Sequence, residues 1–316
     1  MNKKMAGLFF LVIVIGISGC REYEGEPTSE AMDYRTGSEG LVLEFPIDTI
    51  TRVYENDPDV RMMVEIRNRG AFPQYDQIGQ LNGRIWVGGF PRDIIDLRPE
   101  SDLLDDEALE GKSSYNLEGG YDGIIISGPA YELPQGTPYY PTKLIVTATY
   151  NYETIGSAKV CIDPFPRGTT VREKVCDVYD YSSISLGTQG APIAVTSIEE
   201  EATHRNLLFK IYVEDVGDGL LIDENDVAKN PNRGYDWDKL NKVRLVDVTV
   251  GNRMMTECRP DVGNYLTLID GKGYIFCQLN TAGIDSVYTT PLNIKLRYAY
   301  ANSVSKDIEI FEEVEY

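Results

Sequence analysis

Short segments in which apolar and polar residues alternate make up most of the chain from Leu41 onward. In residues 60–66 every second side chain is apolar: Val60, Met62, Val64 and Ile66. A period of two places such residues on one face of a β-strand that is buried on one side. Gly, Pro, Asn and Asp separate these segments, and no strand–helix–strand rhythm is present. The pattern therefore predicts an all-β protein built from antiparallel β-sandwiches.

The alternating pattern occurs twice along the chain. Residues 207–213 repeat the pattern of residues 60–66, and residues 144–162 parallel residues 292–310, including a shared Tyr-x-Tyr. In both copies the two tyrosines share a face with the apolar residues before them, and we expect a turn and a separate closing strand after them. We interpret this as an internal duplication with a period of about 147 residues. The alternative is that two unrelated β domains show similar alternation.

Helical signals are weak. Residues 101–110 begin with Ser101, which suits an N-cap, and continue with acidic residues, so they predict two or three helical turns. The matching part of the second copy, residues 225–240, predicts one short turn. We therefore expect far more strand than helix.

The first twenty residues differ from all that follow. Two lysines precede an apolar run from Ala6 to Ile17, which ends in Ile-Ser-Gly-Cys20. The run is about a dozen residues long, whereas a membrane-spanning helix needs roughly 20 and a secretory signal fewer. The segment resembles the lipobox signal of prokaryotic lipoproteins. The resemblance implies cleavage before Cys20, acylation of that cysteine and an extracytoplasmic protein anchored to the membrane by its N-terminal lipid. An ordinary cleaved signal and a short N-terminal anchor are the alternatives.

These features divide the chain into five parts. We predict a signal peptide at residues 1–19, a flexible acidic tether at residues 20–40, a first sandwich at residues 41–186, a linker at residues 187–192 and a second sandwich at residues 193–316. After Cys20 the tether contains no Leu, Ile, Val or Phe, so it has no means of building a core. Because the linker is short, we expect the two sandwiches to pack end to end.

Four cysteines remain besides the lipid-bearing one: Cys161, Cys176, Cys258 and Cys277. An even number of cysteines in an exported chain predicts disulfide bonds, and the absence of any CxxC spacing argues against zinc. Three pairings are possible. We favour Cys161–Cys176 and Cys258–Cys277, because each bond then stays within one copy of the duplication.

The first of these bonds has a predicted structural role. Val160 and Ile162 face inward in the alternating pattern, so Cys161 faces the other side of its sheet. We therefore expect the bond to hold residues 165–186 on the outside of the first sandwich.

Composition argues against several functions. The chain has 50 acidic and 30 basic residues, a formal net charge of −20, which disfavours a nucleic acid partner. His204 is the single histidine, so a Ser-His-Asp site or a multi-histidine metal site is unsupported, and we expect His204 to be a surface residue. No phosphate-binding, dinucleotide-binding or hydrolase motif appears. We therefore predict no catalytic residues, no cofactor and no enzymatic activity.

Two segments leave alternatives open. The acidic stretch from Asp215 to Asp226 offers the oxygen ligands that calcium prefers, but without the EF-hand spacing, and a solvated loop is the alternative. Tyr139 and Tyr140, flanked by prolines, form either an exposed aromatic tip or a plug at the end of their sandwich. We favour the plug, because Tyr288 is the counterpart of Tyr140 in the second copy.

Two sets of residues carry a family resemblance. Residues 64–70 (VEIRNRG) and 211–217 (IYVEDVG) resemble the strand and Asn-x-Gly turn of the CARDB-like branch of the Ig-like superfamily, with Asp215 in the Asn position of the second copy. The strand with Tyr150 and Tyr152 is similar to the late strand of Ig-like sandwiches, in which a tyrosine hydroxyl bonds upstream backbone. The resemblance implies two tandem Ig-like β-sandwiches of a kind found in prokaryotic surface proteins.

The expected function is contact and not catalysis. We expect a lipid-anchored cell-surface structural or adhesive protein that binds another envelope protein or a glycan through sheet edges and loops. One alternative is an accessory subunit of a membrane-associated secretion, pilus or transport complex. A secreted hydrolase is the third possibility.

Overall fold

The computed structural model describes residues 34–74, 77, 80–104, 107–166, 174–203 and 205–313. These residues belong to one compact unit. The predicted signal peptide, the predicted lipid attachment site Cys20 and His204 lie outside the described residues. Within the described part of the chain, no helix is long and apolar enough to cross a membrane.

The last residues of the predicted tether contact the folded body. The Gly40 carbonyl accepts a hydrogen bond from the Arg69 N–H at 2.9 Å, and the Gly37 carbonyl accepts one from the Gly190 N–H at 3.0 Å. These bonds connect the segment that precedes Leu41 to the first copy and to the predicted linker between the copies. Residues 34–40 therefore take part in the fold.

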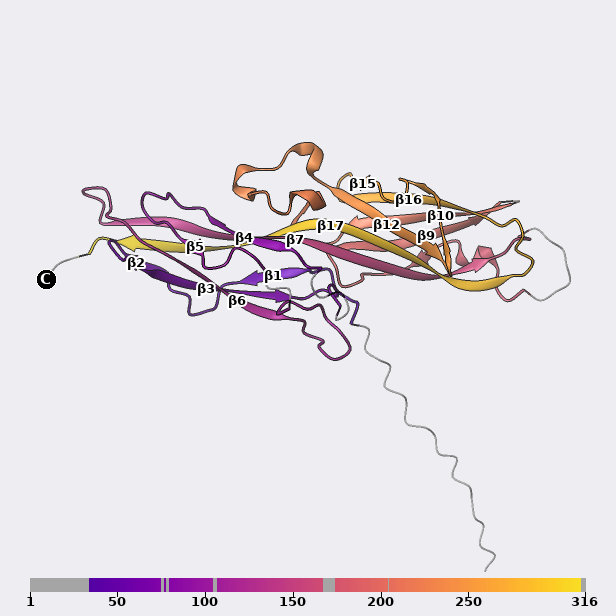
Figure 1. Ribbon diagram of the computed structural model, residues 1–316, viewed down its shortest axis with the longest axis horizontal. Helices are drawn as coiled ribbons and strands as arrows, with labels where there is room; N and C mark the ends of the chain where they lie inside the picture. The colour runs from indigo at the N-terminus through magenta and orange to yellow at the C-terminus, as the bar shows by residue number, and fades with distance from the viewer. Residues whose placement is uncertain are drawn as a thin grey trace, which may run out of the picture. The chain divides into compact units, whose positions relative to one another are not determined.

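The described residues form three mainly antiparallel sheets (Figure 1). The four-stranded sheet has the order β1-β3-β6-β5, the five-stranded sheet β14-β16-β10-β9-β8, and the eight-stranded sheet β13-β12-β17-β7-β4 with β2, β11 and β15 attached. The strands are β1 (Leu41–Glu44), β2 (Arg52–Tyr54), β3 (Val60–Asn68), β4 (Gly83–Gly88), β5 (Arg98–Pro99), β6 (Tyr121–Gly128), β7 (Tyr139–Ile162), β8 (Ile184–Ser185), β9 (Ile193–Ala202), β10 (Asn206–Asp215), β11 (Leu220–Ile222), β12 (Lys242–Val250), β13 (Arg253–Met254), β14 (Glu257–Arg259), β15 (Tyr265–Thr267), β16 (Lys272–Asn280) and β17 (Tyr288–Phe311). The prediction of an all-β protein with antiparallel sheets is confirmed.

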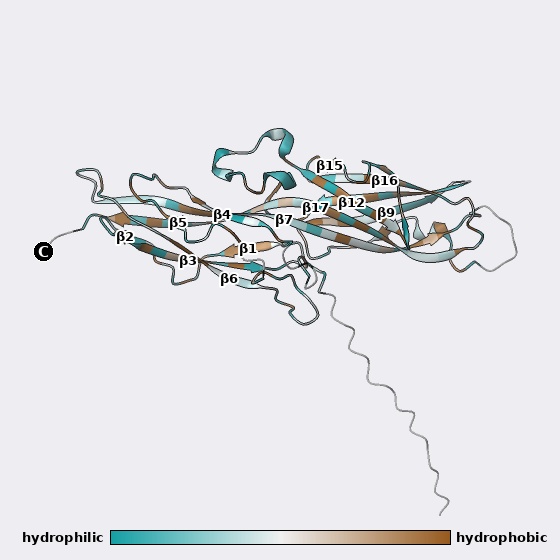
Figure 2. Ribbon diagram, in the orientation of Figure 1, coloured by the Kyte–Doolittle hydropathy of each residue, from teal (hydrophilic) through white to brown (hydrophobic). Residues whose placement is uncertain are grey.

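The period-two pattern correctly identified the central strands of the two smaller sheets. In β3 the side chains at alternate positions from Val60 to Asn68 are buried, and those between them are not. In β10 the same alternation buries Leu207, Phe209, Ile211 and Val213. Figure 2 shows the resulting mixture of hydrophobic and hydrophilic residues along the strands. Both strands lie between two neighbours in their sheets, so each is fixed by hydrogen bonds on both sides.

The eight-stranded sheet is built on two long strands, one from each copy. β7 and β17 are each 24 residues long and pair with each other over their entire length. The prediction that each copy turns after its tyrosines and adds a separate closing strand is wrong. The polar residues that suggested a turn stay in the strand, because the other copy supplies their hydrogen-bond partners: Gly156 pairs with Ile294, and Ser303 pairs with Thr147.

The pairing of these strands is symmetric with respect to the duplication. Asn151 pairs with Ala299, its own counterpart in the second copy. On either side of this pair, Tyr150 lies opposite Tyr300 and Tyr152 lies opposite Tyr298. Such reciprocal contacts are those of an isologous interface, in which two equivalent units meet about a two-fold axis. The two copies therefore share one sheet, whereas we had expected two sandwiches packed end to end.

The predicted helix at residues 101–110 is absent from the described residues. The Asp102 carbonyl accepts a hydrogen bond from the Ile85 N–H at 2.9 Å, and Leu103 forms a bridge with Arg84. The segment thus runs along the open edge of β4, where backbone groups need partners. The matching segment of the second copy forms three 3₁₀ turns, η3 (Glu224–Asp226), η4 (Pro231–Arg233) and η5 (Trp237–Lys239), in a largely hydrophilic excursion (Figure 2).

Candidate functional site

The Tyr-x-Tyr motifs form a buried polar network at the middle of the shared sheet. The Tyr152 hydroxyl accepts from the Phe72 N–H at 3.2 Å and lies 3.0 Å from the Asn68 side-chain oxygen. In the second copy the Tyr300 hydroxyl accepts from the Gly219 N–H at 3.0 Å and lies 3.0 Å from an Asp215 oxygen. The two arrangements join each tyrosine to the turn after β3 or β10.

The other tyrosine of each motif has a second pair of equivalent contacts. The Tyr150 hydroxyl accepts from the Leu41 N–H at 3.0 Å and donates to Asn302 at 2.7 Å. The Tyr298 hydroxyl accepts from the Ile193 N–H at 3.4 Å and lies 3.0 Å from the Thr154 hydroxyl. These hydroxyls bond upstream backbone, as the sequence resemblance implied.

All four tyrosines are neutral structural groups. Burial raises the pKa of Tyr150, Tyr152, Tyr298 and Tyr300, because the phenolate would be desolvated. Each hydroxyl has partners, so the network satisfies buried backbone donors that would otherwise cost about 1–3 kcal/mol each. The network therefore holds the copies together.

The structure pairs Cys161 with Cys176 and Cys258 with Cys277, which is the pairing that the sequence favoured. Cys258 and Cys277 lie directly opposite each other on β14 and β16, with both side chains buried. This bond fixes the edge strand β14 to the five-stranded sheet.

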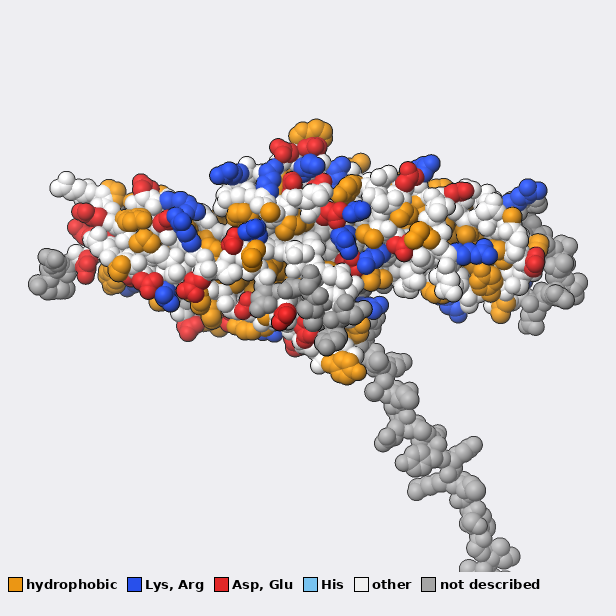
Figure 3. Space-filling view, viewed as in Figure 1, with side chains coloured by type: hydrophobic (Ala, Val, Ile, Leu, Met, Phe, Trp, Pro, Cys, Tyr) orange, Lys and Arg blue, Asp and Glu red, His pale blue; other side chains and the backbone are white. Residues whose placement is uncertain are grey.

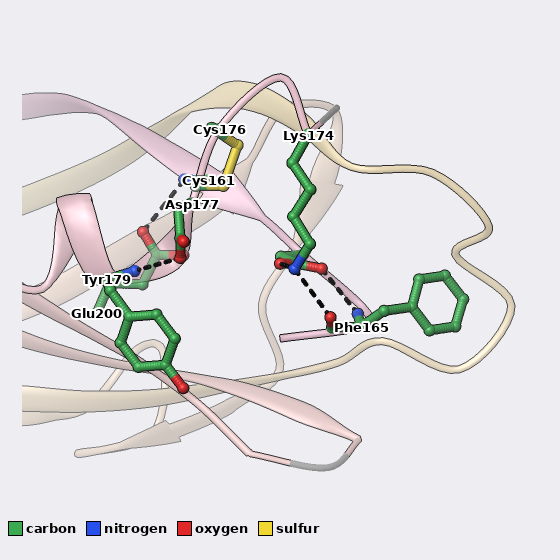
Figure 4. The surroundings of a disulfide bond; sticks show 8 residues. Cys161, Phe165, Lys174, Cys176, Asp177, Tyr179 and Glu200 are labelled. Atoms are coloured by element: carbon green, nitrogen blue, oxygen red, sulfur yellow. Dashed lines mark hydrogen bonds and ion pairs between the residues drawn. A yellow bond between two sulfur atoms is a disulfide. The ribbon is translucent and has the colours of Figure 1, made fainter. Parts of the chain in front are cut away.

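The first disulfide lies in a different place from the one predicted (Figure 4). Cys161 is fully buried, and the segment that follows Cys176 forms the 3₁₀ helix η2 (Val178–Tyr181), in which Val178 is also buried. That segment then adds β8 to the five-stranded sheet by pairing with β9. The expectation that the bond holds residues 165–186 on the first sandwich is therefore wrong. The alternation of inward and outward residues along one strand shows which face Cys161 lies on, but not which sheet residues 174–186 join.

Polar contacts strengthen the same segment. Lys174 forms an ion pair of 2.6 Å with Asp163, whose side chain is fully buried, and also donates to the Phe165 carbonyl at 2.9 Å. Asp177 caps η2 by accepting from the Tyr179 N–H at 3.0 Å. Figure 4 shows these contacts on either side of the disulfide.

Glu200 is a buried carboxyl beside this disulfide. One of its oxygens accepts from the Cys161 N–H at 3.1 Å, and the other is buried without a partner in the described part of the chain. Burial raises the pKa of Glu200 to about 8, because a carboxylate at this position would lose its hydration. The group is therefore protonated at neutral pH and makes folding stability depend on pH.

The outer face of the five-stranded sheet carries an exposed aromatic patch, which we define as Lys210, Tyr212, Tyr274 and Phe276. Tyr274 and Phe276 are 54% and 36% exposed. Tyr212 lies directly opposite Tyr274, with ring centroids 6.5 Å apart, and the Lys210 ammonium lies 4.8 and 4.9 Å from the two ring centroids. Sequence reasoning missed this patch, although outward positions on β10 and β16 occupied by aromatic residues were a readable signal.

The acidic stretch does not gather into a metal site. Asp223 caps η3 and lies 3.4 Å from the Lys239 ammonium, and Glu224 pairs with Arg244 at 2.8 Å. Asp215 contacts Tyr300, as described above. Among the described residues, no group of three acidic, His or Cys side chains is placed to hold a metal ion.

The tyrosines at the strand ends differ in exposure. Tyr140 packs against the hydrophobic core, as the plug interpretation requires. Tyr139 is 50% exposed, and its ring stacks on Phe311 at 6.1 Å between centroids. Tyr288, the expected second plug, is 36% exposed. The two copies thus end differently.

No protein-family model matches this chain, and no curated protein matches it. Among solved structures, the chain is similar to the E. coli chaperone DraB at 13% sequence identity, with 88% of this chain and 98% of that chain covered and a TM-score of 0.20. At this identity and TM-score the likeness identifies neither a family nor a function.

Proposed function

We propose that this protein is a lipid-anchored extracytoplasmic contact protein, built of two Ig-like copies that share one sheet, that binds another envelope protein or a glycan. Its anchor is the lipid on Cys20. Its contact surface is the aromatic patch on the outer face of the five-stranded sheet.

Two features support the location. Disulfide bonds persist in oxidising compartments, so the Cys161–Cys176 and Cys258–Cys277 bonds indicate an extracytoplasmic protein. The N-terminal segment has the order of charged, apolar and small residues that a lipoprotein signal requires. Diacylation supplies two chains, which is sufficient for stable anchoring.

The single observation that carries the contact function is the aromatic patch. Tyr274 and Phe276 project from a sheet face where alternation would place polar residues. Aromatic residues are enriched in the surfaces through which proteins bind partners. On the face shown in Figure 3, acidic and basic side chains are interspersed with hydrophobic ones.

The patch is tested by binding of the purified full-length protein to whole cells and to isolated cell envelopes. The double variant Tyr274→Ser/Phe276→Ser should lose most of its binding, whereas Tyr121→Ser, which removes a 43% exposed aromatic ring from the four-stranded sheet, should not. Equal binding by the double variant and the wild type would exclude the patch as the contact surface.

The anchor is tested independently by metabolic labelling with palmitate. Cys20→Ser should abolish incorporation of the label and release the protein from the membrane fraction. Labelling that persists in this variant would reject Cys20 as the attachment site.

A further inference from the structure

A second surface feature is a shallow cleft at the end of the eight-stranded sheet. The cleft has a volume of about 490 Å³ and lies between the β12–β13 turn and the beginning of β17. Its polar lining consists of Asn252, Arg253, Tyr288, Thr290 and Asn293. This volume is in the range of small-molecule sites, about 300–1,000 Å³.

The wall of the cleft is held in place by backbone contacts. Val250 pairs with Arg253, so the turn has the two-residue form, with Gly251 at a φ of 56°. The Gly251 N–H donates to the Pro291 carbonyl at 2.8 Å. A Cβ at Gly251 would lie 2.7 Å from the Thr290 hydroxyl oxygen, so only glycine permits this approach. The turn is thereby fixed against β17 before any ligand binds.

The charge of the cleft is unusual for this chain. The protein has a formal net charge of −20, yet no acidic side chain lines the cleft. Arg253 is exposed and forms no ion pair within the described part of the chain. By contrast, the groove on the outer face of the four-stranded sheet combines Arg67 and Arg69 with three glutamates. The guanidinium of Arg253 is therefore available to an anion.

The remaining lining groups suit a polyhydroxylated ligand. The Asn293 side-chain oxygen accepts from the Ser157 hydroxyl at 2.7 Å, which orients the amide with its NH₂ group left to donate. Asn252 and Thr290 supply a further amide and a hydroxyl. The Tyr288 ring, 36% exposed, offers a flat π-face to the C–H groups of a sugar ring.

We propose that this cleft binds an acidic saccharide, with Arg253 on the carboxylate, the asparagines on hydroxyls and Tyr288 against a ring face. The assignment rests on the proposed function only in placing the protein where envelope glycans occur. A guanidinium forms two parallel hydrogen bonds with a carboxylate, which gives both affinity and orientation. An acidic peptide could also pair with Arg253. A tyrosine ring and two side-chain amides beside that charge suit a sugar ring with its hydroxyls better than a peptide.

The test measures binding of defined saccharides to the purified protein by isothermal titration calorimetry. Trigalacturonate and 3′-sialyllactose should bind, and the methyl ester of trigalacturonate, whose carboxylates are neutralised by methyl groups, should bind at least about tenfold more weakly. Arg253→Gln should weaken trigalacturonate binding by about tenfold or more and remove the preference for the acid over the ester. Tyr288→Ala should weaken both forms.

The matched control is Arg205→Gln, which removes the same charge from an exposed arginine outside the cleft. This variant should bind as the wild type does. Absence of saccharide binding at millimolar concentration, equal losses in the two arginine variants, or stronger binding of an oligoglutamate peptide than of trigalacturonate would each overturn the proposal. Because the assay uses free saccharides, it succeeds or fails independently of the aromatic patch and of the lipid on Cys20.

Discussion

Asn68 at the end of β3 and Asp215 at the end of β10 occupy equivalent places in the two copies. Both accept a hydrogen bond from a turn N–H, and both contact a tyrosine hydroxyl of the shared sheet. Their surroundings differ. Asn68 is fully buried and donates to the carbonyls of Phe72 and Leu109 at 2.7 and 2.8 Å, whereas Asp215 is only half-buried.

The difference shows what the tyrosine contact requires and what the neighbouring loops add. The tyrosine hydroxyl needs only an oxygen that accepts its hydrogen bond, and the side chain of either Asn or Asp provides one. In the first copy residues 109–120 fold over the site and bring carbonyls that need a donor, which only the amide provides. In the second copy the Asp215 N–H donates to the Gly271 carbonyl at 2.8 Å, and the described hydrogen bonds of the Asp215 side chain come from the Gly217 N–H and the Tyr300 hydroxyl, not from a carbonyl. Burial raises the pKa of the Asp215 carboxyl, and this carboxyl accepts a hydrogen bond from the Tyr300 hydroxyl.

Among the tests of this comparison, replacing a tyrosine of the Tyr-x-Tyr motifs should lower the free energy of unfolding most. Tyr152→Ala deletes a fully buried ring and leaves the Phe72 N–H without its acceptor, so we expect a loss of about 3–5 kcal/mol in the free energy of unfolding. Tyr300→Ala should cost less, because its partner Gly219 is less deeply buried than Phe72. Urea denaturation of the two variants measures the difference. Equal losses would show that the copies contribute alike despite their different loops.

Each copy also has one disulfide, and the two bonds close loops of similar length, with sequence separations of 15 and 19 residues. Removing either bond by double Cys→Ser substitution should cost about 3 kcal/mol in the chain-entropy model. The local effects should differ. Loss of Cys161–Cys176 should speed hydrogen exchange in residues 174–186, whereas loss of Cys258–Cys277 should speed it in β14. Unchanged exchange in residues 174–186 would show that the Asp163–Lys174 ion pair and β8 are enough to hold that segment.

Exchanging the two acceptor residues sharpens the comparison directly. Asn68→Asp removes the donor to two buried carbonyls and introduces a buried acid, so we expect a loss of about 2 kcal/mol or more. Asp215→Asn retains an oxygen acceptor for Tyr300 and Gly217, so the expected change is below about 1 kcal/mol. Thermal unfolding of both variants tests this asymmetry, and a larger loss for Asp215→Asn would contradict it.

A pH-dependent effect concerns Glu200, whose side chain is buried on β9. In the unfolded chain Glu200 loses its proton near the ordinary pKa of 4.5, whereas the folded protein retains the proton until about 8. Stability should therefore fall as the pH rises through this interval and stay lower above it. Glu200→Gln, which is neutral at every pH, should stabilise the protein relative to the wild type by about 3–5 kcal/mol more at pH 9 than at pH 4.5, since one pKa unit corresponds to about 1.4 kcal/mol.

Chemical denaturation between pH 4 and 9 provides the measurement for this variant. Identical pH profiles of the wild type and Glu200→Gln would show that the carboxyl is solvated and not buried. Aspartates on the surface titrate in both proteins, so only the difference between the two profiles reports on Glu200.

Part of the fold and of the candidate site was predictable, and the reasons are local. Alternation in residues 60–66 and 207–213 identified two central strands, because one face of each strand is buried. The expectation that each bond stays within one copy favoured the pairing that the structure contains. The aromatic patch and the Arg253 cleft were missed, because each combines residues from separate strands or turns that only sheet register brings together. The helix expected at residues 101–110 is absent from the described residues, because backbone groups at the open edge of β4 form hydrogen bonds with that segment.

The sequence by itself determined the all-β character and the buried face of each central strand, because these follow from side-chain periodicity within short segments. Only the tertiary structure decided that β7 and β17 continue through both copies as one pair, and that residues 174–186 join the five-stranded sheet. The physical reason is that backbone hydrogen bonds have no sequence signature of their own. A polar stretch such as residues 153–157 becomes a turn or a strand according to whether a partner strand lies beside it, and here the second copy provides that partner.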